Sequence, residues 1–244
     1  MQTLGSESLT FRYLVAVDME GYSRRDTAQQ ARAQGALERA LSRAAEHAGL
    51  GREHWYRLPG GDGELAILPE GADGLALVAD YPRELASSLN GVNQGNRELR
   101  LRLRLAIHHG AVAPGCFGPV GKSLVEISRL VDSEAVRQQL RQRNDRDIAL
   151  IVSDTVYGEV IQSRLRDLDP GDFRRTCVRA KGISYIGFLR DSALGMPEPE
   201  EIPSAHVAAA STSCTVGTPA GPGGRRTTIT AAPSAAAASI LGQV

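Results

Sequence analysis

The sequence predicts an α+β domain, and three features near its N-terminus indicate this. The run FRYLVAVD at residues 11–18 is apolar and β-branched, which is typical of a buried strand. Over residues 30–49, apolar side chains recur at three- and four-residue spacing, which predicts a helix that Gly49 ends. Two short runs, at residues 55–58 and 64–68, then flank the turn sequence PGGDG and predict a β-hairpin.

The next elements continue the alternation between helix and strand. Residues 74–90 predict a helix, which Pro82 either restarts or kinks. Residues 99–108 alternate between apolar and basic side chains, which predicts a strand with one buried and one solvent-facing side. Residues 122–143 carry apolar side chains at helical spacing and predict a single helix, and residues 148–152 predict a short buried strand.

The last elements complete the domain. We expect a further helix that begins at Asp154, with Ser153 as its cap. Residues 173–178 and 185–189 predict a closing hairpin around the turn sequence AKG. The opening order of strand, helix, strand, strand, helix, strand matches a ferredoxin-like βαββαβ sandwich. The remaining elements form a C-terminal αβ extension.

Composition divides the chain into a folded part and a tail. From residue 196 onward Ala, Pro, Ser, Thr and Gly dominate and large apolar residues almost disappear. Such a segment cannot bury enough surface to offset its chain entropy. We therefore expect an N-terminal extension over residues 1–10, one domain over residues 11–190 and a disordered tail over residues 191–244.

Charge and cysteine content argue against several classes of function. The 28 basic and 28 acidic residues give a net charge of zero, so no electrostatic feature favours nucleic acid or a membrane as partner. The three cysteines show no CxxC spacing, which argues against a zinc site or a disulfide framework. Without a signal pattern or an apolar stretch of about 20 residues, a cytoplasmic protein is expected.

Two aspartates are placed where a metal site could form. Asp18 ends the first strand and Asp62 lies at the tip of the first hairpin, and these elements are neighbours in a ferredoxin-like sheet. Both carboxylates would therefore meet at one edge, where a divalent cation would relieve their repulsion. Hard oxygen ligands favour Mg²⁺ or Mn²⁺, and Mg²⁺ completes its shell with substrate phosphates. The alternative for Asp62 alone is an ordinary Asp-Gly turn.

Five motifs carry a resemblance to a known family. They are, in order along residues 11–190, VAVDMEGYS, GGDGELAIL, LRLRLAIHHGAV, VGKSLVEISRLVDSEAVRQQL and RAKGISYIGFL. The first two resemble the metal motifs of class III adenylate and guanylate cyclases, and the third resembles that family's strand with its His-Gly or Thr-Gly. The fourth resembles its dimer-interface helix, and the fifth resembles its closing Lys-Gly hairpin. Among such domains, the chain resembles the divergent cyclase-like proteins of actinobacteria.

The resemblance implies a reaction that converts a nucleoside triphosphate to a 3′,5′-cyclic nucleotide and pyrophosphate, with two Mg²⁺ or Mn²⁺ ions per site. The residues that it assigns to the site are the metal ligands Asp18, Asp62 and the backbone carbonyl of Met19, the nucleotide contacts Gly21, Tyr22 and Lys181, and the catalytic arginine Arg129. That arginine would stabilise charge developing at the phosphate. Sites of this family lie across a homodimer interface, so the metals and Arg129 would come from different subunits.

Two positions depart from the family's pattern. Val125 stands where a ribose-orienting Asn is expected, and Leu58 stands where an adenine-specifying Lys is usual. The sequence therefore does not specify whether ATP or GTP would be the substrate. Loss of the Asn would remove substrate positioning and lower turnover. A second hypothesis is therefore a catalytically degenerate module that binds nucleotide or a partner protein in signalling. The sequence GGDGE also suggests a diguanylate-cyclase-like domain, but Gly63 stands where that family needs an acidic residue.

Overall fold

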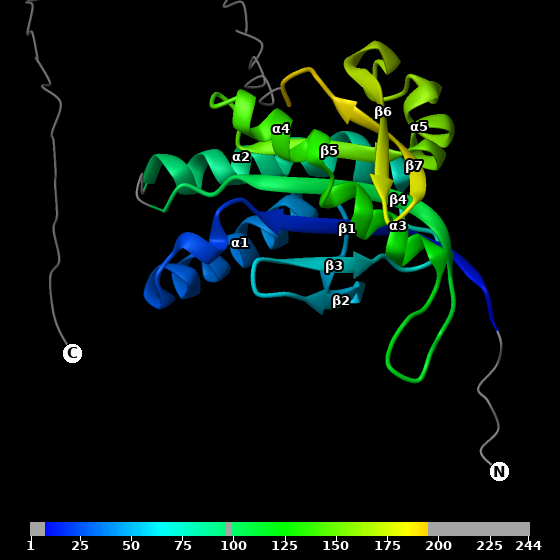
Figure 1. The fold of residues 1–244 in the computed structure, drawn as a ribbon, viewed down its shortest axis with the longest axis horizontal. Helices are drawn as coiled ribbons and strands as arrows, with labels where there is room; N and C mark the ends of the chain where they lie inside the picture. The colour runs from blue at the N-terminus through cyan, green and yellow to red at the C-terminus, as the bar shows by residue number, and fades with distance from the viewer. Residues whose placement is uncertain (1–7, 96–98, 195–244) are drawn as a thin grey trace, which may run out of the picture. The chain divides into compact units, whose positions relative to one another are not determined.

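The computed structural model describes residues 8–95 and 99–194, which contain a seven-stranded mixed sheet with helices on both faces (Figure 1). The strands are β1 (Thr10–Met19), β2 (Tyr56–Pro59), β3 (Gly63–Ile67), β4 (Leu103–Val112), β5 (Ile148–Ser153), β6 (Phe173–Ala180) and β7 (Ile183–Arg190). The α-helices are α1 (Thr27–His47), α2 (Tyr81–Gly95), α3 (Lys122–Val131), α4 (Glu134–Gln142) and α5 (Asp154–Glu159).

The strand order of the sheet is β2-β3-β1-β4-β5-β7-β6. Its first four strands have the order of a ferredoxin-like sheet, and their neighbouring pairs are all antiparallel. β5 then adds parallel to β4, and the β6–β7 hairpin adds antiparallel to β5. The predicted fold class, a ferredoxin-like sandwich with a C-terminal αβ extension, is confirmed.

α1 and α2 pack together over one face of the sheet, where they bury the larger hydrophobic core. α1 begins with a capping box, in which the side chains of Asp26 and Gln29 each accept a hydrogen bond from the other residue's amide. It ends at His47, and Gly49 follows with a φ of 69°, a conformation that glycine adopts without strain. The predicted end of this helix is therefore confirmed.

The helix predicted over residues 74–90 has two parts. A π-helical turn over Ala76–Asp80 precedes α2, which begins at Tyr81. Pro82 follows the π-helical turn directly and has no N–H to donate, and the amide of Tyr81 donates to the carbonyl of Ala76, which is the spacing of a π-helix. The backbone stays helical on both sides of the turn, at Leu75 and Tyr81, so the helix is continuous and does not restart at Pro82.

The prediction of one helix over residues 122–143 is wrong. α3 ends with Asp132 as its C-cap, and α4 begins after Ser133, whose extended backbone (φ −67°, ψ 147°) interrupts the helix. Asp and Ser side chains compete with helical hydrogen bonds and favour such boundaries. Both helices cover the second face of the sheet, over β1, β4 and β5.

The predicted solvent-facing side of the strand at residues 99–108 is also wrong. α3 and α4 cover this side of β4, and the side chains of Arg102 and Arg104 are only 14% and 13% exposed. Arg102 pairs with Glu20 and donates to main-chain carbonyls at the end of α4, while Arg104 pairs with Asp18. An alternation of leucine and arginine looks the same whether the arginines face water or buried carboxylates.

The ends of the expected domain are only partly described. Residues 1–7 of the expected extension and residues 195–244 of the expected tail lie outside the described residues. β1 begins at Thr10, and the amide of Asp191 donates to the carbonyl of Asp172 at 2.8 Å, so the chain just after β7 still contacts the domain. In residues 8–95 and 99–194, no helix is both long and apolar enough to span a bilayer.

Candidate functional site

The structure brings Asp18 and Asp62 together at one end of the sheet. Asp18 is paired with Gly63 in the β1–β3 ladder, and the amide of Met19 donates to the carbonyl of Asp62 at 2.7 Å. A Cβ atom on Gly63 would lie 1.8 Å from the carbonyl oxygen of Val17, so only glycine lets the hairpin approach β1 this closely. Met19 buries its side chain in the core, so its backbone is the part that borders the site.

Three carboxylates lie near one another at this end of the sheet, those of Asp18, Asp62 and Asp132. Burial raises the pKa of Asp18, and the carboxylates of Asp62 and Asp132 raise it as well, against the opposing effect of Arg104. A divalent cation would relieve the repulsion between these carboxylates, and carboxylate oxygens are the donors that Mg²⁺ and Mn²⁺ prefer. Over the part of the chain that the structure describes, no group of three or more His, Cys, Asp or Glu side chains could hold a metal ion. A cation here would therefore draw its further ligands from water and substrate phosphates.

Arg104 already neutralises part of this charge. It lies opposite Asp18 in the β1–β4 ladder, and its Nε and Nη2 both donate to Oδ1 of Asp18, the Nε at 2.8 Å. Its Nη1 lies 3.5 Å from Oδ1 of Asp132, the residue that caps the end of α3. The sequence motifs did not indicate this contact. The only signal for it was the adjacency of the first and fourth strands in the predicted sheet.

One side chain of α1 ties the loop after β1 to the tip of the hairpin. Gln34 donates through Nε2 to the hydroxyl of Tyr22 at 2.9 Å and to the carbonyl of Gly61 at 2.8 Å. Gly21 has a φ of 70°, and a Cβ atom there would lie 2.7 Å from the guanidinium of Arg24. Gly21 and Tyr22 thus form a constrained turn directly after the β1 end that carries Asp18.

Arg129 lies in the last turn of α3 and is half-buried. Within the described residues it makes no hydrogen bond or ion pair, and the other arginines there that lack such a partner are all exposed. A partly desolvated guanidinium with no partner in its own chain is suited to bind an anion. Val125, one turn earlier, is 48% exposed, and Leu58 on β2 is 38% exposed, so both departures place apolar side chains on the surface.

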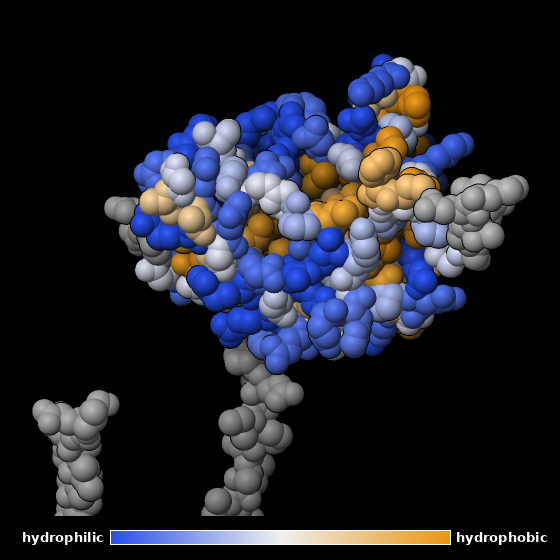
Figure 2. Space-filling view, turned by 90° about the horizontal axis from the view of Figure 1, so that it is seen from below, coloured by the Kyte–Doolittle hydropathy of each residue, from blue (hydrophilic) through white to orange (hydrophobic). Residues whose placement is uncertain are grey.

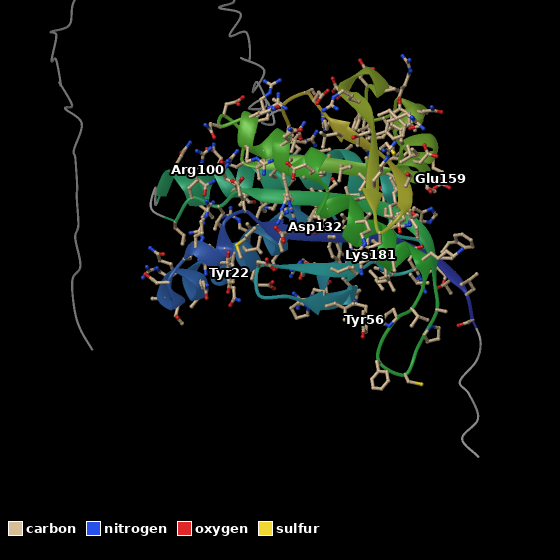
Figure 3. The ribbon with its side chains drawn as sticks, viewed as in Figure 1. Tyr22, Tyr56, Arg100, Asp132, Glu159 and Lys181 are labelled. Atoms are coloured by element: carbon tan, nitrogen blue, oxygen red, sulfur yellow. The ribbon has the colours of Figure 1, made fainter. Side chains whose placement is uncertain are left out.

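Lys181 is separated from the aspartates' end of the sheet. It is exposed in the β6–β7 turn, where its φ is 50°. Figure 3 shows Tyr22 and Lys181 on opposite sides of Asp132. Within one chain, the structure therefore brings Asp18, Asp62, Gly21 and Tyr22 together and leaves Lys181 outside this group.

A hydrophobic surface lies on the β2 edge of the molecule. Tyr56 and Leu58 are exposed and lie opposite Ile67 and Leu65 in the β2–β3 ladder. Figure 2, which views the molecule from the β2 side, shows hydrophobic surface gathered on this face among hydrophilic residues. Contiguous apolar surface of this kind is typical of a contact with another protein.

Comparisons with known proteins were made at the levels of sequence and fold. No protein-family model matches the sequence, and no curated protein matches it either. Among solved structures, the guanylyl cyclase Cya2 matches with a TM-score of 0.54 and 17% identity, over 80% of this chain and 97% of that one. The adenylate/guanylate cyclase/hydrolase from Silicibacter pomeroyi matches with a TM-score of 0.51 and 19% identity, over 79% of this chain and 99% of that one.

A third structure shows the same likeness. It is the catalytic core of a rhodopsin-guanylyl cyclase with converted specificity in complex with ATPalphaS, with a TM-score of 0.50 and 14% identity over 75% of this chain and 98% of that one. At such identities the likeness concerns the fold. The chain has the catalytic-domain fold of class III adenylyl and guanylyl cyclases, as the resemblance of its motifs implied.

Proposed function

We propose that this chain is a nucleotidyl cyclase-type domain that converts a nucleoside triphosphate to a 3′,5′-cyclic nucleotide and pyrophosphate. The observation that carries the proposal is the juxtaposition of Asp18 and Asp62 at the sheet end of a cyclase fold. The raised pKa of Asp18 supports it, because burial, its largest cause, and the neighbouring carboxylates disfavour the charged carboxylate, and a bound cation would offset both.

The chain's own residues divide the work between binding and charge stabilisation. Asp18 and Asp62, with the Met19 backbone beside them, would hold two Mg²⁺ or Mn²⁺ ions. Metal ions held by these residues would supply Lewis-acid chemistry for the ribose 3′-hydroxyl and the polyphosphate. The turn at Gly21 and Tyr22 gives the triphosphate a constrained backbone to lie against. The remaining two side chains, Arg129 and Lys181, are cationic and would stabilise charge that develops on the phosphates.

We further propose that a second copy of the chain completes the site, as a cytoplasmic homodimer. Arg129 has no partner within the described residues of its own chain, and Lys181 lies away from Tyr22 (Figure 3). Both therefore suit a site shared between subunits, in which Arg129 faces the α-phosphate and Lys181 the terminal phosphates. The exposed apolar side chains of Tyr56 and Leu58 would be covered in such an assembly.

The second candidate is a degenerate cyclase-like module that binds nucleotide or a partner protein in signalling. The exposed apolar side chains of Val125 and Leu58 favour it, because neither can hydrogen-bond a ribose or a base. In this case the aspartates would retain ligand binding while turnover is lost.

A turnover assay with Mn²⁺ and each of the four nucleoside triphosphates tests the proposal. We expect the parent protein to form a cyclic nucleotide from at least one of them. Asp18→Asn and Asp62→Asn should each abolish turnover and the stabilisation by Mn²⁺–nucleotide, which is about 2.7 kcal/mol at a hundredfold excess over Kd. Asp145→Asn is the matched control, because it removes an exposed carboxylate between α4 and β5.

The outcomes separate the two candidates. Stabilisation that depends on Asp18 and Asp62, without turnover on any nucleotide, identifies the binding module. Stabilisation that persists in both variants places the site elsewhere on the chain.

A further inference from the structure

Arg104 of β4 is held differently from Arg102, which lies just before the strand. Arg102 pairs with Glu20 at 2.8 Å and also donates to main-chain carbonyls at the end of α4, which fix it to the fold. The side chain of Arg104 donates to no carbonyl of the described residues. Within the described residues its partners are two carboxylates, those of Asp18 and Asp132. Arg104 is therefore retained only by groups of opposite charge.

The guanidinium of Arg104 converges on one oxygen of Asp18. Both Nε and Nη2 donate to Oδ1, and Oδ2 accepts no hydrogen bond from the described residues. A divalent cation at Asp18 would share this carboxylate with a second positive charge. Since the side chain of Arg104 is only 13% exposed, water screens little of the repulsion between the two. Coordination of the cation by both carboxylate oxygens of Asp18 thus requires the guanidinium of Arg104 to leave Oδ1.

Asp132 gives Arg104 a place to withdraw to. Its Oδ1 lies 3.5 Å from Nη1 of Arg104, which is long for a hydrogen bond and can shorten when the guanidinium leaves Asp18. Arg137 donates to the same oxygen and keeps Asp132 in place. Asp132 caps the end of α3, the helix whose last turn carries Arg129.

We propose that Arg104 is an internal counter-ion of Asp18, which a divalent cation displaces toward Asp132, and that it thereby sets the cation affinity of the site. This inference rests on the proposed function, because it requires a cation at Asp18. The displacement adds positive charge at the end of α3. It therefore couples the filling of the cation site to the helix end that carries Arg129.

Binding of Mn²⁺ alone, without nucleotide, tests the inference, with free Mn²⁺ followed by electron paramagnetic resonance on the full chain. Arg104→Gln removes the competing charge and should bind Mn²⁺ roughly fivefold or more tightly than the parent. Asp132→Asn removes the alternative partner and should weaken binding. Arg12→Gln, a matched loss of an ion-paired arginine near the other end of the β1–β4 ladder, should leave the affinity unchanged.

Two further variants make the result decisive. Arg104→Lys keeps the charge without the paired donors, so its Mn²⁺ affinity should lie between those of the parent and Arg104→Gln; it also serves if Arg104→Gln does not fold. Asp18→Asn should abolish binding in every background. If the parent binds Mn²⁺ through Asp18 but Arg104→Gln binds it no more tightly, Arg104 is not a counter-ion that competes with the cation. The metal site itself is then still supported. No Asp18-dependent binding in either protein overturns the metal site itself.

Discussion

The two sides of β4 are both buried but differ in chemistry. Toward α1 and α2 the strand presents Leu103, Leu105 and Ile107, which are fully buried among apolar neighbours. Toward α3 and α4 it presents Arg104, which pairs with carboxylates, and His108, which is buried with neither ring nitrogen hydrogen-bonded within the described residues. The comparison suggests a division of roles. The first side supplies stability, and the second holds groups whose state can change with ligand or pH.

The largest loss of stability is expected from a substitution on the apolar side of β4, which faces α1 and α2. Leu105→Ala removes a fully buried side chain and leaves a cavity, so it should lower the free energy of unfolding by about 2–5 kcal/mol. The folded fraction should keep the parent's affinity for Mn²⁺–nucleotide. Chemical denaturation and a binding titration measure the two quantities, and Leu165→Ala, at a leucine 53% exposed, is the control with little change. Weaker Mn²⁺–nucleotide binding by folded Leu105→Ala would show that the apolar side of β4 also contributes to ligand binding.

A smaller, pH-dependent change in stability is expected on the side of β4 that faces α3 and α4. Burial lowers the pKa of His108 to about 4, and His109 adds to this effect. The ordinary value is 6.5, so the folded state binds this proton less well than the unfolded chain. His108 therefore contributes stability above that pH, and about 3 kcal/mol is lost as the pH falls toward 4.

His108→Gln isolates this contribution, because it removes the titrating ring. Its free energy of unfolding should fall less steeply than the parent's between about pH 7 and pH 4, as measured by denaturant titration at each pH. Glu126, whose carboxylate lies 3.8 Å from the ring, is present in both proteins and cancels in the difference. Parallel curves would show that His108 does not titrate differently in the folded state.

The smallest change in stability is expected at the site. Gln34→Ala removes two hydrogen bonds of an exposed side chain and should cost no more than about 1 kcal/mol. It should nevertheless weaken Mn²⁺–nucleotide binding up to about tenfold, because Tyr22 and Gly61 are no longer tied together. Gln94→Ala is the control, since within the described residues the only side-chain hydrogen bond of that exposed amide is to Asn90. Equal affinities for the two variants would show that the tie is not needed for binding.

The fold was predictable because its signals are local or topological. The hairpin around Asp62 and the end of α1 at Gly49 follow from turn chemistry, and strand order then places Asp62 beside Asp18. The interruption between α3 and α4 also had a local signal in Asp132 and Ser133, but the apolar periodicity continues across it and obscured it.

The ion pair at the site had no local signal. Arg104 and Asp18 are 86 residues apart, and their contact depends on the register between β1 and β4 together with the cover that α3 and α4 provide. Periodicity shows that the arginines share one side of the strand, but it does not show what lies over that side. The roles proposed for Arg129 and Lys181 require a second copy of the chain, which neither periodicity nor strand order can place.

The central claim, a cyclase site shared between two subunits, is tested most directly by mixing two inactive variants. Asp62→Ala and Arg129→Ala damage opposite halves of the site, so a heterodimer has one site with both lesions and one with none. Equal mixing should restore about a quarter of the parent's turnover, since about half of the dimers are mixed. Asp62→Ala mixed with Asp18→Ala, which damage the same half, should restore nothing. An active parent whose Asp62→Ala and Arg129→Ala variants show no recovery on mixing would contradict the shared site, and a parent with no turnover would contradict the cyclase itself.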